Sequence, residues 1–86
     1  MKVILHRNFE KKFVKLHPEL QEKFKERRNL FLEDHFHPLL NNHPLSGNRT
    51  GQWSINITGD WRAVYVFKDD STVIFLDIDT HSNLYR

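Results

Sequence analysis

The segment that decides the fold is WSINITGDW, residues 53–61. Its apolar side chains, Trp53, Ile55 and Ile57, alternate with polar ones, which is the period of a strand with one buried face. Thr58-Gly59-Asp60 predicts a tight turn after this strand. Two further strands follow at 61–67 and 72–78, joined by a polar stretch that suits a hairpin connection. These residues therefore predict an antiparallel meander of three strands.

The N-terminal part of the chain predicts a short strand and two helices. Residues 2–5 are mostly aliphatic and suit the strand, and Asn8 is the expected N-cap of the first helix. Phe9 and Phe13 recur at helical spacing. Pro18 ends this helix, because a residue before proline leaves the helical region, and it also favours the first turn of a second, longer helix.

The pattern as a whole predicts one α+β domain over residues 1–86. An N-terminal strand and a two-helix hairpin are expected to pack on one face of an antiparallel sheet of about four strands. Residues 34–51, rich in His, Pro, Asn and Gly, are expected to form a long loop. A chain of 86 residues is too short to divide its core in two.

Composition excludes several classes of protein. The chain has no cysteine, which rules out disulfides, zinc–thiolate sites and a thiol nucleophile, and it predicts a cytoplasmic location. No apolar segment approaches the roughly 20 residues that span a bilayer, so we expect no membrane association. Thirteen Lys and Arg against eleven Asp and Glu leave a net charge of +2, which suits an anionic partner without requiring one.

Three short motifs stand in a fixed order in the second half of the chain. They are HPLSG at 43–47, DW at 60–61, and THSNLY at 80–85, directly after the last predicted strand. Together with the order of strands and helices, they resemble the RelE/ParE superfamily of bacterial toxins, and especially its YafQ-like branch. The resemblance covers essentially the whole chain.

The resemblance implies the toxin of a type II toxin–antitoxin module, which cuts mRNA on the ribosome and is held in check by a cognate antitoxin. The YafQ-like catalytic positions fall on four residues, with Trp61 beside them: His43, Asp60, His81 and Tyr85. One position departs from the pattern, because Asn56 stands where YafQ-like chains carry a second hairpin histidine.

Two imidazoles can cut RNA without a metal or a cofactor. One removes the proton of the 2′-hydroxyl that attacks the phosphate, and the other protonates the leaving 5′-oxygen. Which of His43 and His81 is the acid stays open. Growing charge on the phosphate needs cations, and the candidates for RNA binding are Arg49, Arg62 and Arg86. Tyr85 is expected to orient a base or the phosphate, and Asp60 to fix or charge an imidazole.

Each of these residues also has a simpler interpretation. Asp60 is an ordinary turn residue by type, and Trp61 could stack on a base but is more typical of a core. His81 could be a surface or capping histidine. The six histidines do not have the spacing of a zinc site, and the chain lacks a glycine-rich phosphate loop, so no metal or nucleotide cofactor is expected.

Two alternative functions remain. A ParE-like toxin has the same architecture but acts on DNA gyrase, and the paired histidines speak against it. A non-catalytic or degenerate member would act by binding alone, and Asn56 is the sequence feature that favours it.

Overall fold

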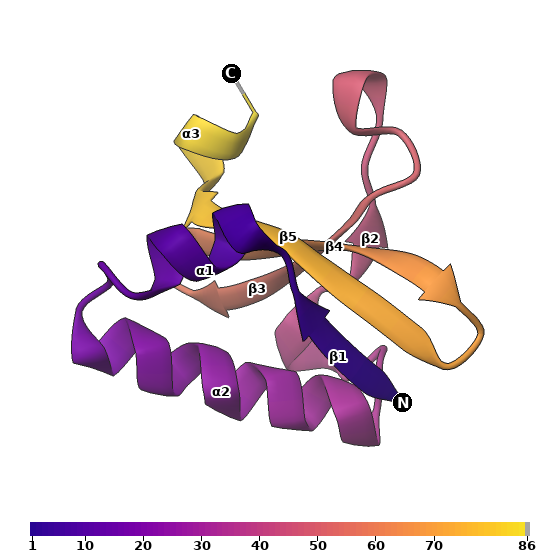
Figure 1. Ribbon diagram of the computed structural model, residues 1–86, viewed down its shortest axis with the longest axis horizontal. Coiled ribbons are helices and arrows are strands. Elements are labelled where there is room, and N and C mark those ends of the chain that lie inside the picture. The colour runs from indigo at the N-terminus through magenta and orange to yellow at the C-terminus, as the bar shows by residue number, and fades with distance from the viewer. Residues whose placement is uncertain (86) are drawn as a thin grey trace.

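The computed structural model describes residues 1–85, which form a five-stranded sheet with helices packed against it (Figure 1). In chain order the elements are β1 (Lys2–Leu5), α1 (Arg7–Phe13), α2 (Pro18–Glu33), the 3₁₀ helix η1 (Pro38–Leu40), β2 (His43–Pro44), the 3₁₀ helix η2 (Gly47–Arg49), β3 (Trp53–Thr58), β4 (Trp61–Asp69), β5 (Thr72–Thr80) and α3 (His81–Leu84). None of the helices in this part of the chain is long and apolar enough to cross a membrane.

The strand order is β1-β5-β4-β3-β2, which confirms the α+β class and the meander of β3, β4 and β5. Two expectations are corrected. The sheet has five strands rather than about four, because His43 and Pro44 pair with β3 inside the stretch predicted to be a loop. Proline is tolerated there because β2 is an edge strand. β1 also runs parallel to β5, the result of a crossover through α1 and α2.

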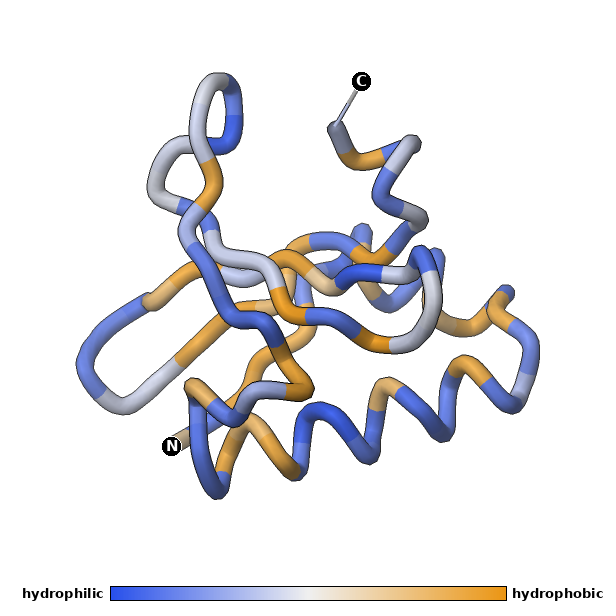
Figure 2. Tube along the Cα trace, turned by 180° about the vertical axis from the view of Figure 1, so that it is seen from behind, coloured by the Kyte–Doolittle hydropathy of each residue, from blue (hydrophilic) through white to orange (hydrophobic). Residues whose placement is uncertain are grey.

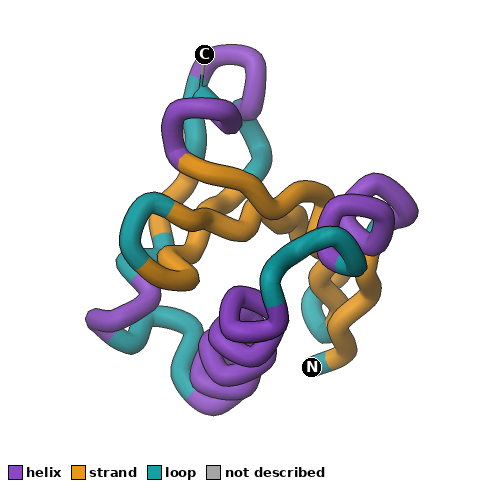
Figure 3. The backbone as a smooth tube through the Cα atoms, turned by 90° about the vertical axis from the view of Figure 1, so that its left-hand side faces the viewer, coloured by secondary structure: helices purple, strands orange, loops and turns teal. Residues whose placement is uncertain are grey.

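Helices α1 and α2 both bury aromatic side chains in the core against one face of the sheet, as predicted. Phe9 of α1 and Phe24 of α2 meet Phe75 of β5, with ring centroids 5.9 and 5.3 Å from it. Phe31, further along α2, packs on Tyr65 of β4. Figure 3 shows α2 running beneath the sheet. The core therefore lies between α2 and one sheet face, and α2 does not cover the opposite face.

An irregularity in β5 decides which of its side chains reach the core. Phe75 and Ile78 are both buried in the core cluster, although three residues apart they would point to opposite faces of a regular strand. The register shifts between Val64 and Tyr65, whose partners are Asp77 and Phe75, so Leu76 is an extra residue. This bulge returns Ile78 to the core and sends Asp77 and Asp79 to the opposite face.

Helix α1 begins earlier than predicted, and its N-cap is His6 rather than Asn8. The Nδ1 atom of His6 accepts a hydrogen bond from the Asn8 backbone N–H at 3.1 Å. His17 and His37 cap α2 and η1 in the same way. An imidazole nitrogen can accept like the oxygen of the usual capping residues, so three of the six histidines serve local structure.

Candidate functional site

The face of the sheet opposite α2 carries the candidate site. Helix α3 and the segment between β2 and β3 both stand up from this face (Figures 1 and 2). Between them lies a pocket of about 800 Å³, a size typical of ligand sites. It is lined by His43, Pro44, Leu45, Ser46, Asn48, Arg49, Gln52, His81, Leu84 and Tyr85. Four of these residues, His43, Arg49, His81 and Tyr85, were predicted to be site residues.

His43 has a defined ring orientation. It lies in the edge strand β2, opposite Ser54 of β3. Its Nδ1 atom is 2.7 Å from the carbonyl oxygen of Asn41, a residue in the left-handed conformation with φ of 44°. A carbonyl oxygen only accepts, so Nδ1 carries a hydrogen. Nε2 is therefore the ring nitrogen of His43 that remains for proton exchange with a ligand.

His81 is the first residue of α3, and its backbone is held from two sides. Its N–H donates to the Asp60 carbonyl oxygen at 2.8 Å, and the preceding Thr80 caps the helix by accepting from the Asn83 N–H. The imidazole is exposed on the pocket wall. It meets the Tyr85 ring edge to face, with centroids 4.6 Å apart and an angle of 66° between the planes.

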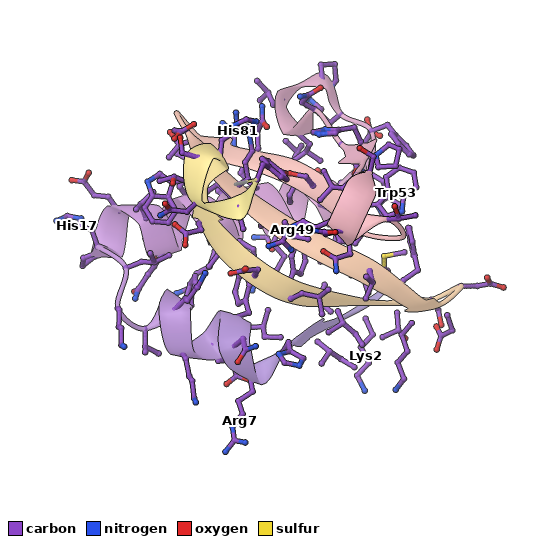
Figure 4. The ribbon with its side chains drawn as sticks, turned by 90° about the horizontal axis from the view of Figure 1, so that it is seen from above. Lys2, Arg7, His17, Arg49, Trp53 and His81 are labelled. Atoms are coloured by element: carbon purple, nitrogen blue, oxygen red, sulfur yellow. The ribbon has the colours of Figure 1, made fainter. Side chains whose placement is uncertain are left out.

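Arg49 reaches from η2 across to β5 and α3. Its Nε donates to the Leu84 carbonyl oxygen at 3.1 Å, and Nη1 donates to Gln52 Oε1 at 2.9 Å. Its Nη2 lies 3.5 Å from Asp77 Oδ2. In Figure 4, seen from above, Arg49 lies over the sheet, inward of the helical turn that carries His81.

Three other proposed site residues, Asp60, Trp61 and Arg62, do not line the pocket. Asp60 is exposed in the β3–β4 turn, and its backbone carbonyl oxygen accepts the hydrogen bond from the His81 N–H. Trp61 is half-buried and packs against the core cluster. Arg62 donates to the carbonyl oxygens of Gly59 and Trp61, at 2.9 and 3.0 Å. Arg86 lies outside the described residues.

A charged cluster behind the pocket was missed by sequence reasoning. Lys12 of α1 bridges Asp77 Oδ1 at 2.7 Å and Asp79 Oδ2 at 3.0 Å. Asp79 also accepts from the Asn83 side chain, at 2.9 Å. Two aspartates alternating at the end of an apolar strand were a usable signal for a carboxylate pair on one face. Their cation comes from a distant helix, which no local pattern indicates.

The cluster shifts the pKa of two members. Burial raises the pKa of Asp79, but hydrogen bonds from Asn83, the Thr80 N–H and Lys12 outweigh it, and the net pKa lies below the ordinary value. Burial lowers the pKa of Lys12, but the hydrogen bonds and charges of Asp77 and Asp79 outweigh this effect and raise it. These shifts widen the pH range over which Asp79 and Lys12 are both charged.

Asn56 lies on the same sheet face as the pocket but does not line it. Its Oδ1 atom is buried and has no hydrogen-bond partner among residues 1–85, as is also true of the Tyr85 hydroxyl. No three His, Cys, Asp or Glu side chains within those residues are arranged to hold a metal ion.

Known structures share this fold. YafQ from E. coli strain BL21(DE3) matches with a TM-score of 0.79 at 21% identity, over 99% of this chain and 98% of that one. A YoeB/ParE toxin from Agrobacterium tumefaciens gives 0.78 at 21%, over 94% and 99%. The E. coli DinJ–YafQ complex gives 0.75 at 22%, over 99% and 98%. The architecture is thus that of the RelE-like toxins.

The family follows from the sequence itself. The family of ParE toxins of type II toxin–antitoxin systems, parDE, matches residues 3–85. The chain therefore belongs to the ParE toxin family, within the RelE/ParE superfamily that the motifs indicated. The comparison with curated proteins gives no match.

Proposed function

We propose that this protein is a toxin that cuts mRNA on the ribosome by metal-independent acid–base catalysis. The observation that carries the proposal is that His43 and His81, far apart in the chain, line one pocket together with Tyr85. The Nε2 atom of His43 and the exposed imidazole of His81 are both available to a bound ligand. A pair of proton-exchanging groups in one open pocket suits the cleavage of a phosphodiester.

In the proposed reaction, one histidine takes the proton of the 2′-hydroxyl as its oxygen attacks the neighbouring phosphorus. The bond from phosphorus to the 5′-oxygen breaks, and the other histidine protonates that oxygen. The products are a 2′,3′-cyclic phosphate and a 5′-hydroxyl. Tyr85 orients the substrate beside His81. Asp60 fixes the position of His81, because its carbonyl oxygen accepts the His81 N–H at the start of α3.

The same proposal names the partners. The RNA contacts beyond the pocket are assigned to Arg62, Arg86 and the exposed part of Trp61. A cognate antitoxin is expected because the family belongs to toxin–antitoxin systems, and the DinJ–YafQ complex has this fold. The net charge of +2 suits an acidic segment of that antitoxin as well as RNA. Ribosomes and mRNA place the activity in the cytoplasm.

The experiment adds the purified protein to translating ribosomes and maps new mRNA ends within the reading frame. We expect His81→Gln to lower the cleavage rate by about 10²-fold to 10⁴-fold, the usual contribution of one acid–base group. The matched control is His17→Asn. Asparagine also caps a helix, so α2 keeps its cap, and His17 lies far from His81 in Figure 4. Full cleavage by His81→Gln would remove this residue from the mechanism.

A second candidate is ParE-like action on DNA gyrase, which the match to the family of parDE toxins favours. It predicts inhibition of gyrase supercoiling by the purified protein and no new mRNA ends. Under this alternative His43→Gln and His81→Gln leave toxicity unchanged. The two functions therefore differ both in the target that is affected and in the variants that matter.

A further inference from the structure

The Arg49 side chain, on the pocket wall, is held by three contacts within the protein. Its three guanidinium nitrogens contact three different groups, the Leu84 carbonyl, the Gln52 amide oxygen and the Asp77 carboxylate. About a quarter of the side chain is exposed, at 26%. These contacts come from the end of α3, from the chain just before β3, and from β5. Arg49 thus ties together the two walls of the pocket and anchors them to β5.

Helix α3 needs such support. It has four residues, and a helix of this length is not stable by itself. Its last carbonyl groups have no partner within the helix. Arg49 satisfies one of them, at Leu84, immediately before Tyr85 and one turn after His81. The opposite end of the helix is held by Asp60 and Thr80.

The charge on Arg49 is already balanced. Asp77 and Asp79 carry two negative charges, and Lys12 and Arg49 supply two positive ones. A cation that is matched in this way attracts a phosphate less than an unmatched one, because the nearby carboxylate opposes the approach of an anion. The geometry therefore argues against a phosphate as the main ligand of this guanidinium.

We infer that Arg49 is a positioning residue, which fixes the turn carrying His81 and Tyr85 relative to His43. The inference rests on the proposed nuclease function and replaces a direct contact of Arg49 with RNA. A guanidinium is required because its planar set of donors meets three acceptors at once, whereas the ammonium of lysine is a point charge. Misplacing a catalytic group by about 1 Å can lower a rate about 10²-fold.

The experiment compares Arg49→Lys and Asp77→Asn with the wild-type protein in the ribosome assay. Positioning predicts that both variants lower kcat by about 10-fold to 100-fold, with KM changed less than about twofold. A phosphate ligand predicts the opposite pattern. Arg49→Lys would then raise KM at similar kcat, and Asp77→Asn would lower KM, because it frees the guanidinium. That pattern would overturn the inference.

A second measurement does not depend on activity. The His81 ring lies 4.6 Å from the Tyr85 ring, so its proton resonances carry a ring-current shift from Tyr85. We expect Arg49→Lys to move these resonances toward random-coil values while the core resonances stay in place. The matched control is Arg7→Lys, at an exposed arginine that points away from the molecule in Figure 4. Unchanged His81 resonances in Arg49→Lys would contradict positioning.

The two readouts separate the possible failures. If the wild-type protein cuts no RNA, the proposed function fails, and the His81 resonances still decide whether Arg49 positions α3. If the protein cuts RNA and Arg49→Lys affects neither kcat nor the resonances, only the inference about Arg49 fails.

Discussion

Replacing Lys12 with methionine tests how much the charged cluster stabilises the fold. The Lys12 ammonium donates to Asp77 and Asp79 at 2.7 and 3.0 Å. Lys12→Met keeps most of the aliphatic stem and removes the charge. Among the described residues, the ion pair that then remains at these two carboxylates is the longer one between Arg49 and Asp77, at 3.5 Å.

The expected magnitude lies between two limits. Hydrogen bonds to buried charged groups contribute about 1.5–3 kcal/mol, and exposed ion pairs about 0–1 kcal/mol. The carboxylates are mostly buried, with side chains 22% and 21% exposed, but Lys12 is 43% exposed, so solvent screens part of the interaction. We expect Lys12→Met to lower the free energy of unfolding by about 1–1.5 kcal/mol, or the Tm by about 4–12 °C for a domain of this size.

The effect has a defined pH dependence. The lowered pKa of Asp79 means that its stabilisation is complete above the ordinary carboxyl pKa and is lost as the pH falls through the value in the folded protein. The raised pKa of Lys12 means that its contribution is complete below 10.5 and is lost as the pH rises through its folded value. The difference between wild type and Lys12→Met should therefore be constant near neutral pH and narrow in strong acid.

Urea unfolding at pH 7 and in acid below the lowered pKa of Asp79 in the folded protein measures both quantities. The matched control is Lys25→Met, which removes an exposed pair with Glu22 at 3.4 Å and should cost less than about 0.5 kcal/mol. A loss for Lys12→Met no larger than that of the control, or an equal loss at both pH values, would refute the reasoning.

Three further predictions concern the core and the caps. Phe24→Ala should cost about 3–5 kcal/mol in urea unfolding, because Phe24 is fully buried among three aromatic rings; a loss under 1 kcal/mol would contradict this packing. His17→Ala should cost about 1 kcal/mol and His17→Asn much less, because asparagine also caps a helix; equal thermal shifts would exclude the capping role. Burial raises the pKa of Tyr65 to about 12, so stability linked to this phenol is complete below pH 10 and declines from there to pH 12. The difference between the alkaline absorbance titrations of wild type and Tyr65→Phe should show this ionisation, and a midpoint near 10 would contradict it.

Much of the fold follows from local patterns in the sequence. Alternation at 53–58 and the polar turn after it predict the meander, and Pro18 correctly divides the helices. The parts that were missed depend on distant partners. β2 has only two residues, one of them proline, so it has no period of its own and is defined by its pairing with β3. The bulge in β5 likewise needs the register with β4 to be known.

The candidate site, too, could be predicted from the sequence only in part. His43 and His81 were named from motifs and a family resemblance, since neither lies on a periodic pattern that indicates a pocket. The contact of Arg49 with Leu84, 35 residues later in the chain, has no local signal. Arg49 was predicted to bind RNA because arginines suit phosphates, whereas its three contacts within the protein result from tertiary packing.

The chemistry of the cut RNA ends tests the central claim most directly. Mass spectrometry of fragments released from translating ribosomes should find a 2′,3′-cyclic phosphate, or the 3′-phosphate from its hydrolysis, facing a 5′-hydroxyl. His43→Gln and His81→Gln should each remove these products. Fragments that carry a 3′-hydroxyl and a 5′-phosphate would show attack by water instead, and would contradict cleavage by two histidines in one pocket.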